Sequence, residues 1–458
     1  MIQEATTKKM KTIPGPKATP FLGNFSLMKE VGHTYETYLS LHKEYGDIFR
    51  LALPGGGTAY VLAGADMLQH VLQMNNSNYR KGERFKIAEP LIGKGLFISE
   101  GDFWRRQRRM MQPAFHRKQI ALLVEEMVNT TAEMLDRWQA YADSGQTLDI
   151  QKEMMGLTME IVTRTLFTNS LTSEEVIAVG ESLTFLLEVI SERGNEIIPI
   201  GQKLPTRKNR KFDQSIQELN ELIYRLIDER RASGENGDDL LGMLLDARDD
   251  DGQGMNHLQL RDELITMFLA GHETTAIALS WAFAHLSQSP EVRRRLNEEV
   301  DNVLAGDLPT AADYARLPYA QAVFQESLRL YPPLPLTMRE SIEDDEIDGY
   351  HIPVGSLIFV NFYANHHNPD HWTNPEGFDP DRFLPENSKG RHRFAFLPFS
   401  GGPRQCIGNN FALMEGAVVL AMVAQRFELD LVSGTRIAPH MIGTLRPEGG
   451  VPVTVCRR

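Results

Sequence analysis

Apolar residues recur at three- and four-residue spacing over long stretches of this chain. This spacing follows the turn of an α-helix and predicts helices that each bury one face. The segments with this pattern are 103–112, 120–144, 150–167, 173–193 and 211–232. We therefore expect a mostly helical protein.

The segment 258–287 differs from the others because its apolar residues lie on nearly every side of the predicted helix. A helix of this kind is usually the buried centre of a large domain. Further helices are predicted at 290–305 and 320–330.

Short β-rich regions interrupt the helical pattern. Segments 48–53 and 58–63 are joined by a Pro-Gly-Gly-Gly turn, which predicts a hairpin. Another strand is predicted at 356–360, and short strands are predicted after Phe427. Because no segment has the composition and length of a domain linker, we expect one domain over 1–458, mainly α with a smaller β-rich region (α+β).

Charge and cysteine content exclude several classes of protein. A formal net charge of −13 argues against nucleic acid as a partner. Cys406 and Cys456 are too few for a disulfide framework, which favours the cytoplasm. No apolar run reaches the roughly 18 residues of a membrane span, and the first residues lack the apolar centre of a signal peptide. We expect a soluble protein with no stable membrane anchor.

The positive charges are concentrated in two stretches that contain no acidic residue. One runs between Asp102 and Glu125, and the other between Glu386 and Glu415, around Cys406. Their basic residues are Arg105, Arg106, Arg108, Arg109, Arg117 and Lys118 in the first, and Lys389, Arg391, Arg393 and Arg404 in the second. Solvated surfaces are one interpretation. Because one stretch surrounds the candidate metal ligand, we favour a docking face for an acidic partner.

The segment 399–408, with the sequence FSGGPRQCIG, presents Cys406 in a glycine-rich loop. Gly402 and Gly408 permit positive φ and remove bulk, so that the backbone can lie against a large planar group. Backbone N–H groups and a helix that begins near 407–408 would favour the thiolate, which is the form that binds a metal. The pattern indicates a haem ligand; a buried structural thiol is the alternative.

A polar sequence interrupts the apolar segment 258–287. Ala270 and Gly271 leave room beside the predicted helix, and Thr274 can donate to the carbonyl four residues before it. Glu273 adds a titratable group next to that hydroxyl. A proton relay is one interpretation of this pattern. The other is a threonine that bonds its own helix beside a solvent-facing glutamate.

Two pairs of residues share a helix face by their spacing. Glu326 and Arg329 lie three apart and can form an ion pair. Trp104 and Arg108 lie four apart, and both side chains donate hydrogen bonds without accepting any. An anionic ligand would satisfy this second pair.

The cysteine segment resembles the signature F-x-x-G-x-R-x-C-x-G of the cytochrome P-450 family, the haem-thiolate monooxygenases. The matching positions are Phe399, Gly402, Arg404, Cys406 and Gly408. The resemblance covers nearly the whole chain, from Pro14 to the final strands, with further motifs in the family's order. It implies the family's fold, a triangular helical prism that holds haem b between a long distal helix and a proximal cysteine loop.

The resemblance also implies a role for each matching residue. Cys406 would be the axial ligand of the haem iron, and Thr274 and Glu273 would be the catalytic residues that deliver protons to dioxygen. The remaining cofactor-binding positions would be Trp104, Arg108, Arg339 and Arg404 at the propionates, Ala270 and Gly271 over the distal face, and Phe399, Gly402 and Gly408 in the cysteine loop. Glu326, Arg329 and Arg382 would hold the proximal scaffold together.

The function implied is hydroxylation or epoxidation of a lipophilic small molecule with O2. The segment after Cys406 is too short for a reductase domain, so two electrons would come from a separate ferredoxin or flavodoxin and its reductase. A peroxide-driven peroxygenase and a haem sensor without turnover are the alternatives. The pair Glu273 and Thr274 counts against both.

The substrate class follows from segments that line the pocket in the family. Here these are 85–98, the helix face at Met267 and Ala270, 334–337 and 441–444, and they are mainly apolar, which favours a fatty acid, a terpenoid or a steroid-like compound. An entrance lid is one interpretation of 197–211, and contact with a membrane surface is the other.

Overall fold

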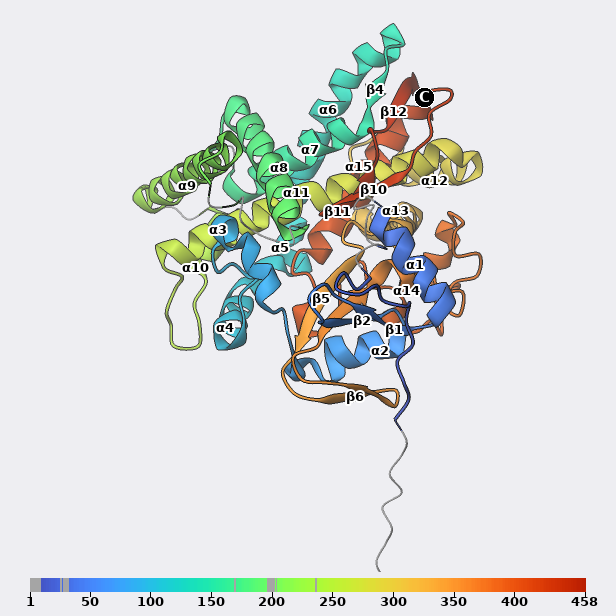
Figure 1. The fold of residues 1–458 in the computed structure, drawn as a ribbon. Helices are drawn as coiled ribbons and strands as arrows, with labels where there is room; N and C mark the ends of the chain where they lie inside the picture. Colours follow the sequence, from blue (N-terminus) through green and yellow to red (C-terminus); the bar gives the residue numbers. More distant parts are fainter. Residues whose placement is uncertain are drawn as a thin grey trace, which may run out of the picture. The chain divides into compact units, whose positions relative to one another are not determined.

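The computed structural model describes residues 10–24, 27, 33–168, 170–195, 202, 204–234 and 237–458. The described part of the chain divides into two compact units. Helices predominate and small sheets accompany them, as predicted (Figure 1). No described helix is both long and apolar enough to cross a bilayer. The lid positions Ile197 to Ile200 and Lys203 lie outside the described residues.

The first unit is built around a five-stranded sheet, from segments within 1–82, 334–376 and 390–406. Its strand order is β1-β2-β8-β5-β3. The bounds are β1 Ile48–Ala52, β2 Thr58–Leu62, β3 Tyr79–Arg80, β5 Leu336–Ser341 and β8 Leu357–Asn361. Strands β1 and β2 form the predicted antiparallel hairpin, whereas β2 and β8 run parallel.

The two faces of this sheet pack in different apolar clusters, because successive side chains of a strand point to opposite faces. Phe49, Leu51 and Val61 pack in one apolar cluster with Tyr38 and Leu41 of helix α1. Ile48, Leu62 and Val360 belong to a second cluster, which contains residues of α2 and the following turn. The other elements of this unit are α1 Thr34–Tyr45, α2 Ala65–Gln69, the π-helical turn His70–Met74, α14 Phe362–His366, and the ribbon β6 Asp345–Ile347 with β7 Tyr350–Ile352.

The second unit contains the long helices, from segments within 83–333, 377–389 and 407–458. They are α3 Glu89–Ile92, α4 Gly101–Met111, α5 Arg117–Leu122, α6 Val124–Ser144, α7 Ile150–Phe167, α8 Ser173–Asn195, α9 Arg207–Ser233, α10 Leu240–Asp246, α11 His257–Gln288, α12 Pro290–Leu304, α13 Pro318–Leu330 and α15 Asn409–Arg426. Two small sheets accompany them, one of β4 Leu148–Asp149, β9 Phe427–Leu431 and β12 Pro452–Arg457, and one of β10 Pro439–Ile442 and β11 Thr444–Pro447.

Helix α11 is the buried centre of this unit, as its sequence predicts (Figure 1). It begins with a capping box in which Asn256 and Gln259 each accept a backbone N–H of the other. It packs against α7, α9, α13 and α15. The predicted helix 120–144 is wrong at its start, because α5 ends at Leu122 and α6 begins at Val124.

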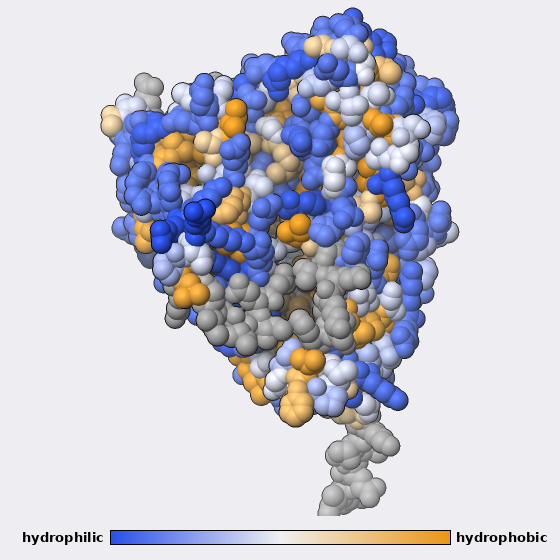
Figure 2. Space-filling view, turned by 45° about the horizontal axis from the view of Figure 1, so that its top comes forward, coloured by the Kyte–Doolittle hydropathy of each residue, from blue (hydrophilic) through white to orange (hydrophobic). Residues whose placement is uncertain are grey.

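Hydrophilic residues predominate on the molecular face shown in Figure 2, and apolar residues lie there in small separate groups. Inside the second unit, buried charged side chains occur on helices α13 and α11.

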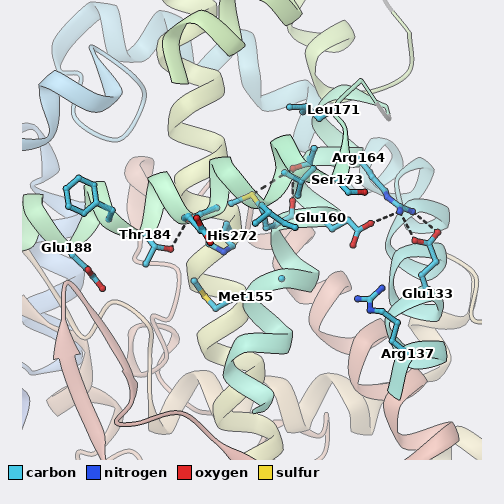
Figure 3. Close-up of a pocket in the computed structure, with 18 of the residues that line it drawn as sticks. Glu133, Arg137, Met155, Glu160, Arg164, Leu171, Ser173, Thr184, Glu188 and His272 are labelled. Carbon is cyan, nitrogen blue, oxygen red and sulfur yellow. Dashed lines mark hydrogen bonds and ion pairs between the residues drawn. The ribbon is translucent and has the colours of Figure 1, made fainter. Parts of the chain in front are cut away.

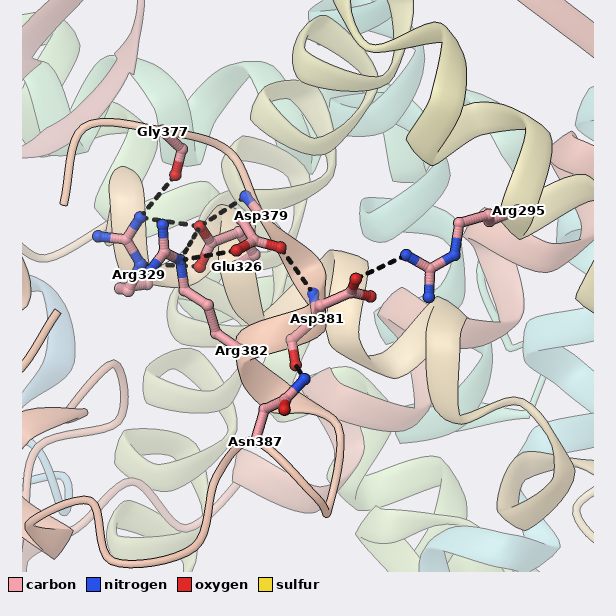
Figure 4. A network of polar contacts seen from close by, with 8 residues as sticks. All are labelled: Arg295, Glu326, Arg329, Gly377, Asp379, Asp381, Arg382 and Asn387. Carbon is pink, nitrogen blue, oxygen red and sulfur yellow. Dashed lines mark hydrogen bonds and ion pairs between the residues drawn. The ribbon is translucent and has the colours of Figure 1, made fainter. Parts of the chain in front are cut away.

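Glu326 of α13 is the centre of a buried ion-pair network (Figure 4). It accepts from Arg329 Nε at 2.7 Å and Nη2 at 2.8 Å, and from Arg382 Nε at 3.2 Å. The backbone N–H of Asp379 donates to Glu326 at 2.9 Å, and Arg329 donates to the Gly377 carbonyl at 3.1 Å. The network thus fixes segment 377–389 to α13.

Removing the carboxylate should leave two buried guanidinium groups without their shared counter-charge. Glu326 and Arg329 are both 0% exposed. We predict that Glu326→Ala lowers the free energy of unfolding by about 3–5 kcal/mol. Urea unfolding followed by circular dichroism measures this loss.

Glu291→Ala is the matched control, because Glu291 pairs with Arg294 at the same three-residue spacing but is 70% exposed. We expect little change for it, since exposed pairs contribute little. Equal effects of the two substitutions would contradict the importance of burial.

Candidate active site

The cysteine loop is held by a close backbone approach at Gly402. Gly402 has φ +67°, and a Cβ there would lie 1.7 Å from the carbonyl oxygen of Leu72 in the π-helical turn. Only glycine fits this position. The loop closes where the Cys406 N–H donates to the Phe399 carbonyl at 2.9 Å. The sulfur-bearing side chain of Cys406 is exposed. This combination of a rigid glycine loop and an accessible thiol suits a ligand of a large planar group.

The middle of the long helix α11 carries an open stripe. Met267, Gly271 and Thr274 are partly exposed and Ala270 is exposed, although the residues around them are mostly buried. Their spacing of three and four places them on one face. The Thr274 hydroxyl donates to the Ala270 carbonyl at 2.7 Å, which is the bond expected from the sequence. Ala270 leaves space for a ligand, but the expectation that Gly271 does the same is wrong: a Cβ on Gly271 would lie 2.6 Å from a Val162 methyl of α7, so Gly271 serves close packing between helices.

Glu273 has different partners from Thr274. Its carboxylate accepts from the Thr444 hydroxyl at 2.7 Å and from Arg446 Nη2 at 2.7 Å, both in strand β11. Burial raises the pKa of Glu273, whereas Arg446 and Thr444 act in the opposite direction. The structure thus places Glu273 as a buried acid that joins α11 to β11. It is not the solvent-facing glutamate of the alternative interpretation.

The four donors predicted for the propionates occur in both units. Trp104 and Arg108 lie four apart on α4 and are partly buried. Arg339 lies on β5, where it is 5% exposed and donates to the Met338 carbonyl at 2.8 Å. Arg404 ends the short helical turn Gly402–Arg404 of the cysteine loop. All four are sites of positive or N–H donor character.

Three arginines of the first basic stretch form ion pairs with acidic side chains. Arg106 pairs with Asp249 at 2.6 Å, and Arg109 pairs with Asp250 at 2.7 Å. Arg105 pairs with Asp102 at the start of the same helix. The segment before α11 therefore brings acidic side chains to α4, which the spacing of charges along the chain did not reveal.

A cavity of about 1010 Å³ lies among α6, α7, α8, α9 and α11 (Figure 3). Its lining includes Met155 and Met159 of α7, Gly180 and Thr184 of α8, and His272 of α11. Burial lowers the pKa of His272 to about 4, so its imidazole is neutral at pH 7. The rim carries an ion-paired cluster of Glu133, Glu160 and Arg164. None of the residues of the open stripe is among those that line this cavity.

Several residues of the site were missed by sequence reasoning. Arg446 carries no local signal, and Thr444 was expected only as part of the pocket-lining segment 441–444. Their bonds to Glu273 could not be predicted, because Glu273 is far away in the sequence. Glu415 did carry one, since it is an acid within the apolar helix α15. It is fully buried, and burial raises its pKa well above the ordinary value. Burial thus favours the protonated form of Glu415.

Comparisons with known proteins were made against families, curated proteins and solved structures. The family model described as Cytochrome P450 matches residues 13–455. Two proteins of Streptomyces melanosporofaciens are similar to this chain. "Cyclooctatin synthase" is 36% identical over 442 residues, which cover 96% of this chain and 94% of that protein. "Cyclooctat-9-en-7-ol 5-monooxygenase" is 36% identical over 423 residues, with 92% and 90% covered.

Among solved structures, the haem domain of cytochrome P450DA matches with a TM-score of 0.89. It is 26% identical in sequence, and the match covers 98% of each chain. The likeness therefore includes both units described above.

The raised pKa of Glu415 gives a prediction for the pH dependence of stability. The folded protein holds the Glu415 proton to a higher pH than the unfolded chain does, so this group's contribution to stability falls as pH rises above the ordinary pKa of 4.5. Glu415→Gln should remove up to about 1.4 kcal/mol per pH unit from that slope. Urea unfolding between about pH 5 and pH 7 measures it. Parallel pH profiles for the two proteins would show that Glu415 is ionised in the folded state.

Proposed function

We propose that this chain, which belongs to the cytochrome P450 family and is a monooxygenase of that family, oxidises a terpenoid. The observation that carries the substrate class is the likeness over nearly the whole chain to a protein named for cyclooctat-9-en-7-ol, a terpenoid. A fatty acid or steroid-like substrate has no comparable support among the two relatives reported above.

Haem is the cofactor of the family, and we propose that the form bound here is haem b with Cys406 as its axial ligand. Two observations favour the fit. Cys406 is exposed in a loop that Gly402 holds by a close backbone approach, and the stripe on α11 has the small residue Ala270 exposed at its centre. When bound, the haem supplies the activation of O2 that side chains lack.

The residues around the cofactor would bind it and manage protons. Trp104, Arg108, Arg339 and Arg404 would donate to its propionates, and Phe399, Gly402 and Gly408 would shape the loop. The Thr274 hydroxyl would pass on a proton while Ala270 keeps space beside it. Both bonds to Glu273 reach Oε1, so Oε2 is the oxygen that would hold a proton.

The buried network of Glu326, Arg329 and Arg382 would keep the scaffold beside the cofactor rigid, and would take no part in the chemistry. Electrons would come from a separate ferredoxin or flavodoxin and its reductase. The peroxygenase alternative is less favoured, because the acid and the alcohol of the expected relay, Glu273 and Thr274, are neighbours on α11.

Replacement of the proposed ligand tests the cofactor assignment. Cys406→Ser should abolish the haem absorption of a thiolate complex and reduce turnover by at least about a thousandfold, since a hydroxyl is a poor iron ligand. Absorption spectroscopy of the reduced carbon monoxide complex measures the loss. Cys456→Ser, at the exposed cysteine of β12, is the matched control and should keep both spectrum and turnover. Retention of the thiolate spectrum in Cys406→Ser would exclude Cys406 as the ligand.

The substrate class is tested by titration of the holoenzyme with terpenoid alcohols, fatty acids and steroids. We expect the terpenoid alcohols to shift the haem absorption band by displacing the water ligand of the iron. They should give product with O2 and reduced ferredoxin but none with hydrogen peroxide alone. A band shift produced only by fatty acids would contradict the terpenoid proposal, and product with peroxide alone would favour the peroxygenase.

A further inference from the structure

Glu263 of α11 is a buried carboxylate that bonds two other segments at once. Its Oε2 accepts the backbone N–H of Leu96 at 2.9 Å, and its Oε1 accepts from Gln107 Nε2 of α4 at 3.2 Å. Glu263 and Gln107 are both 0% exposed. A carboxylate removed from water needs such donors, so the two bonds fix both segments to α11.

The loop at 93–96 is fitted closely to α11 beside this carboxylate. Asp262 accepts the backbone N–H of Lys94 at 2.8 Å. A Cβ on Gly93 would lie 2.1 Å from the Asp262 carboxylate, and one on Gly95 would lie 2.0 Å from the Thr266 hydroxyl. The loop therefore touches α11 directly before the open stripe that begins at Met267. Phe97, which follows the loop, is 41% exposed and packs edge-on against Phe85.

The bonds continue from Gln107 to the protein surface. Gln107 Oε1 accepts from Arg106 Nη1 at 3.3 Å. Arg106 Nε donates to Asp249 at 2.6 Å, and Arg106 Nη2 donates to the Gly254 carbonyl at 3.4 Å. A continuous chain of hydrogen bonds thus runs from the Leu96 amide through Glu263, Gln107 and Arg106 to Asp249. Its outer members are 28% and 12% exposed.

We infer that Arg106, a residue at the surface, is a positioning residue for the loop 93–97 through Gln107 and Glu263. Arg106 orients the Gln107 amide, because its guanidinium can bond only the amide oxygen and thereby directs the amide N–H2 toward Glu263. In that orientation Gln107 donates to Glu263, whose carboxylate also accepts the Leu96 N–H. The consequence for substrate binding rests on the proposed function, in which this loop lines the pocket beside the open stripe.

Burial and the charged groups around Glu263 make the opening of the loop 93–97 dependent on pH. Burial raises the pKa of Glu263 to about 7, and Asp262 acts in the same direction, while the bonds from Leu96 and Gln107 lower it. On α11, Arg261 pairs with Asp262 at 2.8 Å, and on α4 Arg106 faces Gln107. When the loop opens, Glu263 meets solvent, its pKa returns toward 4.5, and the carboxyl group releases its proton. Opening should therefore become up to about tenfold more frequent per pH unit between 4.5 and about 7, and level off above.

Hydrogen exchange of the Leu96 amide in the holoenzyme tests the inference, after correction for intrinsic exchange. Arg106→Ala should raise its exchange rate by about twofold to thirtyfold, the range of couplings carried by such networks. In Glu263→Gln, the pH dependence between 4.5 and 7 should disappear, and the effect of adding Arg106→Ala should be small. The conservative amide keeps the shape of the side chain, so the protein should fold.

Arg109→Ala is the matched control, because Arg109 lies on the same helix and pairs with Asp250 of the same acidic segment, at 2.7 Å. Its effect on Leu96 should be negligible. An unchanged Leu96 rate in Arg106→Ala, an equal effect of Arg109→Ala, or a full effect in the Glu263→Gln background would each overturn the inference.

Binding of 4-phenylimidazole, followed by the haem absorption band, separates this inference from the proposed function. If the loop lines the pocket, Arg106→Ala should change the Kd of this probe by at least about twofold, and Arg109→Ala should not. A change in Leu96 exchange without a change in Kd would support the chain of hydrogen bonds and contradict the placement of the loop at the pocket.

Discussion

Burial of the 32-residue helix α11 is the constraint on which the second unit depends. A helix surrounded by protein must give each of its polar side chains a partner, because an unpaired buried charge costs several kcal/mol or more. Glu263 finds Leu96 and Gln107, and Glu273 finds Thr444 and Arg446. Each solution ties a distant segment to the helix. The open stripe at Ala270 and Thr274 departs from this burial, and we interpret it as the place where a cofactor completes the packing.

The same principle gives separate meanings to acids that look alike in sequence. Glu415 is buried without a basic partner among the ion pairs of the described residues, and burial raises its pKa well above the ordinary value. Glu326 has two guanidinium partners and fixes a segment to α13. Glu263 lies between these cases, with N–H donors in place of cations, which makes it responsive to pH near neutrality. The partners of a buried acid thus decide whether it is structural or able to exchange a proton.

Much of the fold could be predicted from the sequence because its signals are local. The period of apolar residues located α7, α8, α9 and α11, and the Pro-Gly turn located the hairpin of β1 and β2. The Thr274 bond to Ala270 follows from helix geometry alone. The partners of Glu273, Arg106 and Gly402 could not be predicted, since each contact joins residues far apart in the sequence. For the same reason the ion pairs of Asp249 and Asp250 with α4 could not be predicted, although the first basic stretch was expected to be a docking face for an acidic partner.

The central claim is that Cys406 binds the iron of a haem through its thiolate. X-ray absorption at the iron edge of the purified holoenzyme tests this claim most directly, because it identifies the elements bound to the metal. The account predicts a single sulfur ligand together with the nitrogens of the porphyrin. A first coordination shell that contains only nitrogen and oxygen would contradict it.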